Sequence, residues 1–256
     1  MSEMSQPQSP FMFITDLDHT LVGDNNALAE LNQQLQQHRQ THGTVIVYST
    51  GRSLTLYRQL LTEVDLLEPD FLVLSVGTVI YSKGSETPSQ DWIDYLSPDW
   101  DRTKVVAIAQ SFPALTPQPE SEQTQFKASY VIDGEAAQTV LPQLETALRT
   151  AQLDTQIIYS SAQDLDILPR RGNKGAAVAF LQEQVGMSGD RTVVCGDSGN
   201  DIAMFEAAAA KGIVVGNAKP ELRGWYTNQA TAETYLADAH CAGGILEGLL
   251  HFKFLD

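Results

Sequence analysis

Two aspartates follow a short apolar run near the start of the chain. Asp16 and Asp18 come just after residues 11–14 and are separated by a single leucine. Because positions i and i+2 of an extended chain project to the same side, both carboxylates would face one crevice at the end of a buried strand. Two like charges this close are costly to bury unless a cation joins them. The pair therefore indicates a site for Mg²⁺, a hard ion that takes carboxylate oxygens.

Further polar signals lie later in the chain: Thr50-Gly51-Arg52, Lys174, and the pair Asp197 and Asp201. Each of them alone is common in ordinary turns and helix starts. In combination, acids, a hydroxyl and a lysine are typical of phosphoryl transfer, in which a metal and an ammonium neutralise the phosphate while a carboxylate attacks phosphorus. We therefore expect these side chains to converge on one site.

The elements that must position these residues form an α/β pattern. Apolar, β-branched runs predict buried strands at 11–14, 44–49, 71–75, 191–195 and 212–215. Helices are predicted at 27–40, 54–66, 173–185, 202–210 and 242–251. This alternation predicts a Rossmann-like parallel sheet with right-handed crossovers. Ligands of such sheets bind at the carboxyl ends of the strands, where most of the polar signals fall.

The pattern changes near Gly84. Residues 84–125 are rich in proline, with one helix expected at 99–111. Later segments are expected to form a half-exposed strand, a helix and two strands, at 126–132, 135–152, 155–160 and 165–168. This predicts an α+β cap, residues 84–167, inserted into a core formed by residues 11–83 and 168–256. Residues 1–10 are rich in Ser, Gln and Pro and are expected to be a disordered tail.

Composition limits the partners and the compartment. The formal net charge is -16 and the sequence pI is about 4.5, which argues against nucleic acid or an anionic membrane as a partner. A small anionic substrate remains compatible, provided that a metal and a lysine offset the local field. No stretch of the sequence is long and apolar enough to span a membrane. The two cysteines, Cys195 and Cys241, do not suggest a disulfide framework, so we expect a cytoplasmic protein.

Together, these residues resemble the four motifs of the haloacid dehalogenase superfamily of phosphatases. The motifs are Asp16-Leu17-Asp18-His19-Thr20, Thr50, Lys174, and Gly196-Asp197-Ser198-Gly199-Asn200-Asp201. The insert resembles the larger α/β cap of that superfamily. More narrowly, the chain is similar to the sucrose-phosphate phosphatase family of cyanobacteria and plants. That similarity is carried by residues 15–18, 49–53, 67–70, 91–97, 126–130, 165–169 and 171–175.

The resemblance implies roles for the core residues. Asp16 would be the nucleophile that forms an aspartyl-phosphate, and Asp18 would first protonate the leaving sugar oxygen and then activate water. Lys174 would neutralise the phosphate and orient Asp16. Phosphate would also be bound by the Thr50 hydroxyl, the Gly51 N–H and Asn200, and Arg52 would be a further substrate-binding residue.

The resemblance also implies a metal site. Mg²⁺ would be held by the Asp16 carboxylate, the Asp18 backbone carbonyl and Asp197. Asp201 would serve the site through Lys174 or through a metal-bound water, and Thr20 would support the loop. In the cap, polar pairs share one face of each strand, and we expect Lys127 and Asp166 among them to bind sugar hydroxyls.

The implied activity is the Mg²⁺-dependent hydrolysis of sucrose 6-phosphate to sucrose and phosphate, the last step of sucrose biosynthesis. Two alternatives remain open on the sequence alone. The first is a capped phosphatase for another sugar phosphate, such as mannosyl-3-phosphoglycerate or trehalose 6-phosphate. The second is a non-catalytic domain that docks on a sucrose-phosphate synthase. The two roles do not exclude each other, so a catalytic chain could also dock on the synthase. Apart from such docking, we expect a monomer.

Overall fold

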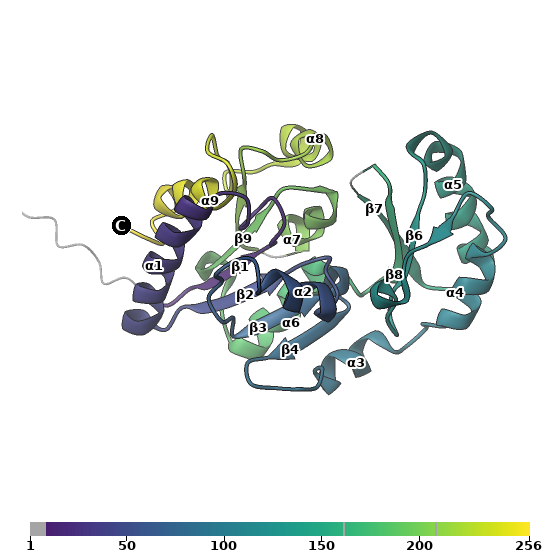
Figure 1. Ribbon diagram of the computed structural model, residues 1–256, viewed down its shortest axis with the longest axis horizontal. Coiled ribbons are helices and arrows are strands. Elements are labelled where there is room, and N and C mark those ends of the chain that lie inside the picture. The colour runs from purple at the N-terminus through teal and green to yellow at the C-terminus, as the bar shows by residue number, and fades with distance from the viewer. Residues whose placement is uncertain (1–8, 161, 208) are drawn as a thin grey trace, which may run out of the picture.

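The structure is a computed structural model that describes residues 9–160, 162–207 and 209–256. Most of the expected tail, residues 1–8, lies outside these ranges. The described strands form two separate sheets, on the left and right of Figure 1. The larger is seven-stranded, in the order β11 (Thr234–Leu236), β10 (Lys211–Val214), β9 (Thr192–Gly196), β1 (Met12–Thr15), β2 (Val45–Ser49), β3 (Phe71–Leu74) and β4 (Val79–Ser82).

The larger sheet is parallel apart from its edge strand β4, which runs antiparallel to β3. β1 is central, with β2 on one side and β9 on the other. Its side chains alternate between two buried layers, so that Phe11 and Phe13 enter one hydrophobic cluster while Met12 and Ile14 enter another. Burial on both faces explains why the strand is apolar without alternation.

Helices cover both faces of this sheet. On one face α1 (Asn25–His42) packs beside α9 (Cys241–His251). On the other face α6 (Lys174–Val185) packs beside α7 (Ile202–Ala207). Two further helices, α2 (Leu54–Leu60) and α8 (Pro220–Gln229), follow β2 and β10. Each described helix falls short of the length or the apolar character needed to cross a membrane.

The smaller sheet is antiparallel and has its own hydrophobic cluster. Its described strands lie in the order β5 (Thr116–Pro117), β6 (Ala128–Val131), β8 (Asp164–Pro169) and β7 (Thr155–Ser160). The helices α4 (Arg102–Ala109) and α5 (Gly134–Thr150) pack against it, on the right of Figure 1. This unit, which we call the cap, and the larger sheet confirm the expected fold class.

Several elements differ from the expectations. The helix expected at 54–66 ends at Leu60, where the N–H groups of Thr62 and Glu63 bond back over three residues and close it. A further helix, α3 (Gln90–Leu96), was not predicted, and its buried Trp92 and Leu96 belong to the cluster under the larger sheet. β8 continues to Pro169, two residues past the expected end of the insert.

The strand expected to be half exposed is instead largely buried. In β6 only Val131 is exposed, while Ala128, Ser129 and Tyr130 are buried. Ala128 and Tyr130 face the hydrophobic cluster of the cap. Ser129 is buried on the opposite face because its hydroxyl donates to Asp166 on the neighbouring strand. Successive side chains of β6 therefore alternate between an apolar and a polar environment, and both environments are buried.

Candidate active site

Asp16 leaves the carboxyl end of the central strand and meets a buried lysine. Its backbone N–H donates to Cys195 O at 3.0 Å, which continues the pairing of β1 with β9. Lys174, the first residue of α6, has a relative exposure of 0%. Its Nζ lies 2.7 Å from Asp16 Oδ1 and 2.6 Å from Asp201 Oδ1. One ammonium group thus joins the first and fourth motifs.

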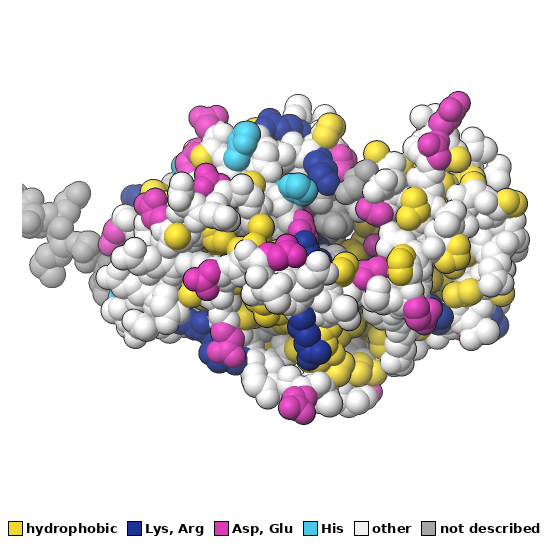
Figure 2. Space-filling model, in the orientation of Figure 1, with side chains coloured by type: hydrophobic (Ala, Val, Ile, Leu, Met, Phe, Trp, Pro, Cys, Tyr) yellow, Lys and Arg dark blue, Asp and Glu magenta, His cyan; other side chains and the backbone are white. Residues whose placement is uncertain are grey.

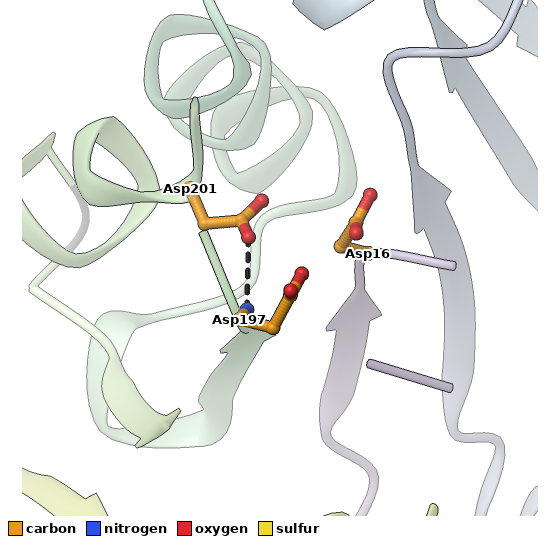
Figure 3. A group of neighbouring side chains, drawn as sticks. All are labelled: Asp16, Asp197 and Asp201. Carbon is orange, nitrogen blue, oxygen red and sulfur yellow. Dashed lines mark hydrogen bonds between the residues drawn. The ribbon is translucent and has the colours of Figure 1, made fainter. Parts of the chain in front are cut away.

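Three carboxylates converge beside this lysine (Figure 3). Oxygens of Asp16, Asp197 and Asp201 all lie within 4.8 Å of one another. Asp201 is already saturated, because its Oδ2 accepts from the N–H groups of Asp197 and Ser198 at 2.9 and 3.0 Å while its Oδ1 binds Lys174. Its geometry is that of a group that holds the loop and the lysine in place.

Asp197 has an oxygen left for a ligand. Its Oδ1 accepts from Thr20 Oγ1 at 3.1 Å, whereas its Oδ2 is buried with no hydrogen-bond partner among the described residues. Leaving a buried carboxylate oxygen unpaired is costly, and a hard divalent cation would remove that cost. The group therefore fits Mg²⁺, with Asp16 and Asp197 as the carboxylates that would hold it.

The pKa shifts of these side chains also indicate a site for a cation. Burial raises the pKa of Asp16 to about 8, with the Asp201 and Asp197 charges adding to it and Lys174 opposing it. Burial, together with Asp201, raises the pKa of Asp197 to about 6. For Lys174, burial would lower the pKa, but attraction to Asp16 and Asp201 outweighs it and the pKa is raised. Three carboxylates around one ammonium leave a deficit of positive charge that a cation would fill.

The Asp18 side chain is held apart from the carboxylate group. Arg52 Nε lies 2.7 Å from Asp18 Oδ2, and Arg52 Nη2 lies 2.7 Å from Asp18 Oδ1. The guanidinium is itself fixed by a bond from Nη1 to Leu56 O at 3.1 Å. Arg52, which we expected to bind substrate, is thus occupied with Asp18.

The second motif packs against the site. Thr50 is fully buried, and its Oγ1 accepts from the Arg52 N–H at 3.1 Å. Gly51 is close to Asn200 of the fourth motif, since a Cβ added to Gly51 would lie 3.8 Å from Asn200 Nδ2. Val76 also borders Gly51 and has a φ of 60°, which is unfavourable for a β-branched residue. Such backbone strain is typical of functional sites.

A cleft of about 320 Å³ separates this group from the cap. Figure 2 shows acidic side chains on both lobes and a hollow between them. The predicted site residues that line the cleft are Asp16, Asp18, Gly51, Arg52, Lys127, Asp166, Asp197 and Asn200. Thr50, Lys174 and Asp201 are buried behind its wall.

The cap wall of the cleft is a buried polar network. Lys127 and Asp166 form an ion pair of 3.5 Å between Nζ and Oδ1, with side-chain exposures of only 3% and 9%. Ser129 donates to the same Asp166 carboxylate. Beside them Gln118 Nε2 donates to Asp164 Oδ1 at 3.0 Å. Ser129 of β6 and Asp166 of β8 are paired on neighbouring strands, and Gln118, Lys127, Asp164 and Asp166 line the same cleft as the core motifs.

Sequence reasoning missed several residues of the cleft. They are His19, Leu56, Val76, Gln118, Glu122, Ser160, Asp164, Ser198 and Lys219. Asp164 lies two residues before Asp166 on β8, so the alternation of side chains along a strand could have placed both on one face. Lys219 stands just before Pro220 and the start of α8, a helix-start signal that could have placed it at the same edge of the sheet. Gln118 and Glu122 reach the cleft only through the packing of the cap on the core.

A family profile, several curated proteins and a solved structure match the chain. A sequence profile described as "Sucrose-6F-phosphate phosphohydrolase" matches residues 9–253. "Probable sucrose-phosphatase 2" of Arabidopsis thaliana is 38% identical over 262 residues, covering 99% of this chain and 62% of the relative. "Mannosylfructose-phosphate phosphatase" of Agrobacterium fabrum is 36% identical over 241 residues, covering 93% of this chain and 95% of that protein.

A solved structure matches over the whole fold. The sucrose-phosphatase of Synechocystis sp. PCC6803, determined in complex with sucrose and phosphate, has a TM-score of 0.91 and 43% sequence identity. The match covers 97% of this chain and 100% of that chain. By contrast, the chain spans 58% to 62% of the length of four plant sucrose-phosphatases that it matches.

Proposed function

Because the chain belongs to the sucrose-6F-phosphate phosphohydrolase family, we propose that it is a Mg²⁺-dependent phosphatase that hydrolyses sucrose 6-phosphate to sucrose and phosphate. This membership confirms the resemblance to haloacid dehalogenase phosphatases. The observation that carries the proposal is the convergence of Asp16, Lys174 and the unpartnered Asp197 oxygen beside a cleft roofed by a polar cap.

The reaction proceeds through a covalent intermediate on Asp16. The Asp16 carboxylate attacks phosphorus, and the bond from phosphorus to the sugar oxygen breaks as that oxygen takes a proton from Asp18. Asp18 then takes a proton from water, which attacks the phosphorus of the aspartyl-phosphate and releases inorganic phosphate. Lys174 holds the Asp16 oxygen at 2.7 Å and so fixes the direction of attack.

The metal and phosphate sites follow from the same residues. Asp16, Asp197 and the Asp18 backbone carbonyl would hold Mg²⁺, with Asp201 acting through Lys174. When bound, the ion supplies positive charge that offsets the phosphate. The Thr50 hydroxyl, the Gly51 N–H and Asn200 are assigned to the phosphate oxygens. Arg52 is assigned to Asp18, because the ion pair between them uses both ends of the guanidinium fork.

Sugar recognition is assigned to the cap. Lys127 and Asp166 already lie in the cleft wall and offer an ammonium and a carboxylate to sugar hydroxyls. Burial of such groups favours substrates that complete their hydrogen bonds and disfavours substrates that leave them unpaired. Cap and core together would exclude water while the leaving group departs.

A second substrate class is favoured by one comparison. The mannosylfructose-phosphate phosphatase matches this chain over 95% of its own length. Sucrose phosphate and mannosylfructose phosphate both present a phosphorylated disaccharide that contains fructose. Core motifs that read phosphate do not separate them, so selection between the two falls to the cap.

Phosphate release from a substrate panel tests the proposal. The panel holds sucrose 6-phosphate, mannosylfructose phosphate, trehalose 6-phosphate, mannosyl-3-phosphoglycerate and glucose 6-phosphate, each with Mg²⁺ and with EDTA. We expect a strong preference for sucrose 6-phosphate that EDTA abolishes. A preference for another member would retain the core chemistry and reject sucrose phosphate, whereas no release from any member would favour the docking alternative.

The remaining assignments belong to the same proposal. We assign residues 11–83 and 168–256 to the core domain and 84–167 to the cap, supported by the separate sheets of the two parts. We place the enzyme in the cytoplasm, in keeping with two cysteines that are both unpaired. A monomer and docking on a sucrose-phosphate synthase stay predictions, which light scattering and pull-down with the synthase would check.

A further inference from the structure

Lys174 is placed by the first turn of α6, and that turn is held from outside the helix. Asn173 is the N-cap residue: its Oδ1 accepts from the Ala176 N–H at 2.8 Å. Its Nδ2 is thereby turned outward and donates to Gln156 Oε1 at 3.2 Å. A side chain of the cap sheet therefore bonds the residue that precedes Lys174.

Gln156 lies on β7 and holds the segment in which the chain returns from cap to core. Its Nε2 donates to the carbonyl oxygens of Pro169, Arg170 and Gly172, at 3.0, 2.8 and 3.2 Å. Because carbonyl oxygens only accept, this contact fixes which end of the amide faces the segment and leaves Oε1 for Asn173. One side chain thus joins the cap sheet, the returning segment and the start of α6.

The core closes the opposite side of Asn173. Gly77 has a φ of +94°, and a Cβ built on it would lie 2.2 Å from the Asn173 carbonyl carbon and 2.4 Å from Lys174 N. Trp92 of α3, on the other crossing between core and cap, donates its Nε1–H to Gly77 O at 3.2 Å. Asn173 therefore cannot move toward the core, and a displacement of Gln156 would shift the start of α6.

Gln156 itself is remote from the chemistry. It borders a groove of the cap with Arg149, Leu153 and Arg170, and it is not among the described residues that line the cleft. A direct contact with a bound substrate is therefore not available to it. Any influence on the reaction has to pass through the backbone of residues 169–174.

We propose that Gln156 is a positioning residue that couples the cap to Lys174. Through Asn173, the placement of the cap sets how Lys174 Nζ meets Asp16 Oδ1. The inference rests on the proposed phosphatase function and deepens it, because the rate of phosphoryl transfer would then depend on a cap side chain outside the cleft, in addition to sugar binding by the cap.

The kinetic test compares Gln156→Ala and Asn173→Ser with wild type. Ser keeps an N-cap oxygen for α6 but loses the amide that reaches Gln156. The substrates are sucrose 6-phosphate and p-nitrophenyl phosphate, which has no sugar for the cap to bind. We expect kcat to fall about tenfold on both substrates with KM nearly unchanged, since a small displacement of a positioned charge slows the chemical step. The double variant should be no slower than the slower single variant, because both remove one contact.

The control is Gln138→Ala, an exposed glutamine of the cap helix α5, which should keep wild-type kinetics. Thermal unfolding establishes that each variant is folded. If Gln156→Ala raised KM for sucrose 6-phosphate but left turnover of p-nitrophenyl phosphate unchanged, Gln156 would act on sugar binding alone and the coupling would be wrong. Additive losses in the double variant would also contradict it.

A second readout needs no turnover. Amide hydrogen exchange in the first turn of α6, residues 174–177, should be faster in Gln156→Ala and Asn173→Ser than in wild type and unchanged in Gln138→Ala. Unchanged exchange in all three would overturn the coupling. If the wild type released no phosphate but the exchange difference were present, the proposed function would have failed while the structural link stood.

Discussion

Arg52 and Asp18 form a two-point ion pair in which both guanidinium-to-carboxylate distances are 2.7 Å. Asp18 is assigned as the acid that protonates the sugar oxygen; because both of its oxygens accept from Arg52, the contact must open at one oxygen before that oxygen can carry the proton. A charge-assisted, bidentate contact of this kind restricts the carboxylate to one orientation. The attraction also raises the pKa of Arg52, chiefly through its hydrogen bonds to Asp18.

Removal of Arg52 should impair proton transfer more than binding. We expect Arg52→Ala to lower kcat on sucrose 6-phosphate about tenfold, since general acid–base catalysis contributes about 10²–10⁴-fold and orientation supplies part of it. The loss should be smaller on p-nitrophenyl phosphate, whose leaving group needs no proton. Arg58→Ala, at an exposed position of α2, is the control. If Arg52→Ala raised only KM, and by the same factor for both substrates, Arg52 would bind the substrate's phosphate and would not orient Asp18.

Loss of the unpaired carboxylate oxygen should weaken the metal site. For Asp197→Asn we expect the Mg²⁺ concentration for half-maximal activity to rise by at least about tenfold, because even supporting groups around a metal contribute that much. Calorimetric titration of Mg²⁺ measures the effect without substrate. Asp190→Asn, at an exposed position, should bind Mg²⁺ as wild type does. If Asp197→Asn bound Mg²⁺ as tightly as Asp190→Asn, Asp197 would not be a ligand and the ion would bind elsewhere.

Lys174 should matter for stability as well as for activity. In Lys174→Met, two carboxylates at 2.7 and 2.6 Å lose their shared ammonium inside the protein. Removing one partner of a buried ion pair costs about 3–5 kcal/mol, so we expect the free energy of unfolding in urea without Mg²⁺ to fall by about 3 kcal/mol. The exposed Lys104→Met should change it by less than about 0.5 kcal/mol. Comparable losses in the two variants would mean that the buried pair contributes no more than a surface pair.

The cap residues should separate sugar binding from chemistry. We expect Lys127→Ala and Asp166→Ala each to raise KM for sucrose 6-phosphate about tenfold, because each leaves the other charge buried and unpaired in the cleft wall. Turnover of p-nitrophenyl phosphate should change little, since it has no sugar. An unchanged KM for the sugar phosphate in both variants would remove them from the substrate site.

His38 should make stability depend on pH. Its ring is buried against Phe11, its Nε2 has no partner among the described residues, and burial lowers its pKa, with His42 adding to the effect. The unfolded chain therefore binds more protons than the native protein below a pH of about 6.5, and the free energy of unfolding falls as the pH drops through that value. The free energy of unfolding, measured by urea titration at several pH values between 5 and 7, should depend less on pH in His38→Gln than in wild type. The exposed His240→Gln should show the same pH dependence as wild type. If the free energy of unfolding depended equally on pH in wild type and in His38→Gln, His38 would not be the group responsible.

Local patterns were sufficient for the strands that carry the motifs. β1, β2, β3 and β9 are short apolar runs buried on both faces, so their sequence alone marks them. α3 was missed because its burial depends on Trp92 and Leu96 reaching a cluster formed by distant segments. β4 was missed because its short run, between Gly77 and Gly84, becomes a strand only through antiparallel pairing with β3.

The sequence predicted those site residues whose positions depend only on the end of a single strand. The spacing of Asp16 and Asp18 marked a candidate metal site, and Lys174, Asp197 and Asp201 stood out as later polar signals to which the resemblance gave roles. The partner of Arg52 was not predictable, because it depends on β1 and β2 lying side by side and on the direction of a long side chain. Gln118 and Gln156 depend on where the cap rests, which no local pattern encodes.

The two crossings between core and cap lie against each other at Leu96 of α3 and Gly172 of the returning segment, since a Cβ added to Gly172 would lie 3.0 Å from Leu96 Cδ2. An insertion whose ends adjoin can be excised and replaced without opening the host fold. The cap is therefore a transplantable module: exchange of residues between these crossings for the cap of a relative should retarget the enzyme to another sugar phosphate while Asp16, Asp18 and Lys174 stay in register. Substrate range in such a scaffold can evolve by replacing one contiguous piece of the gene.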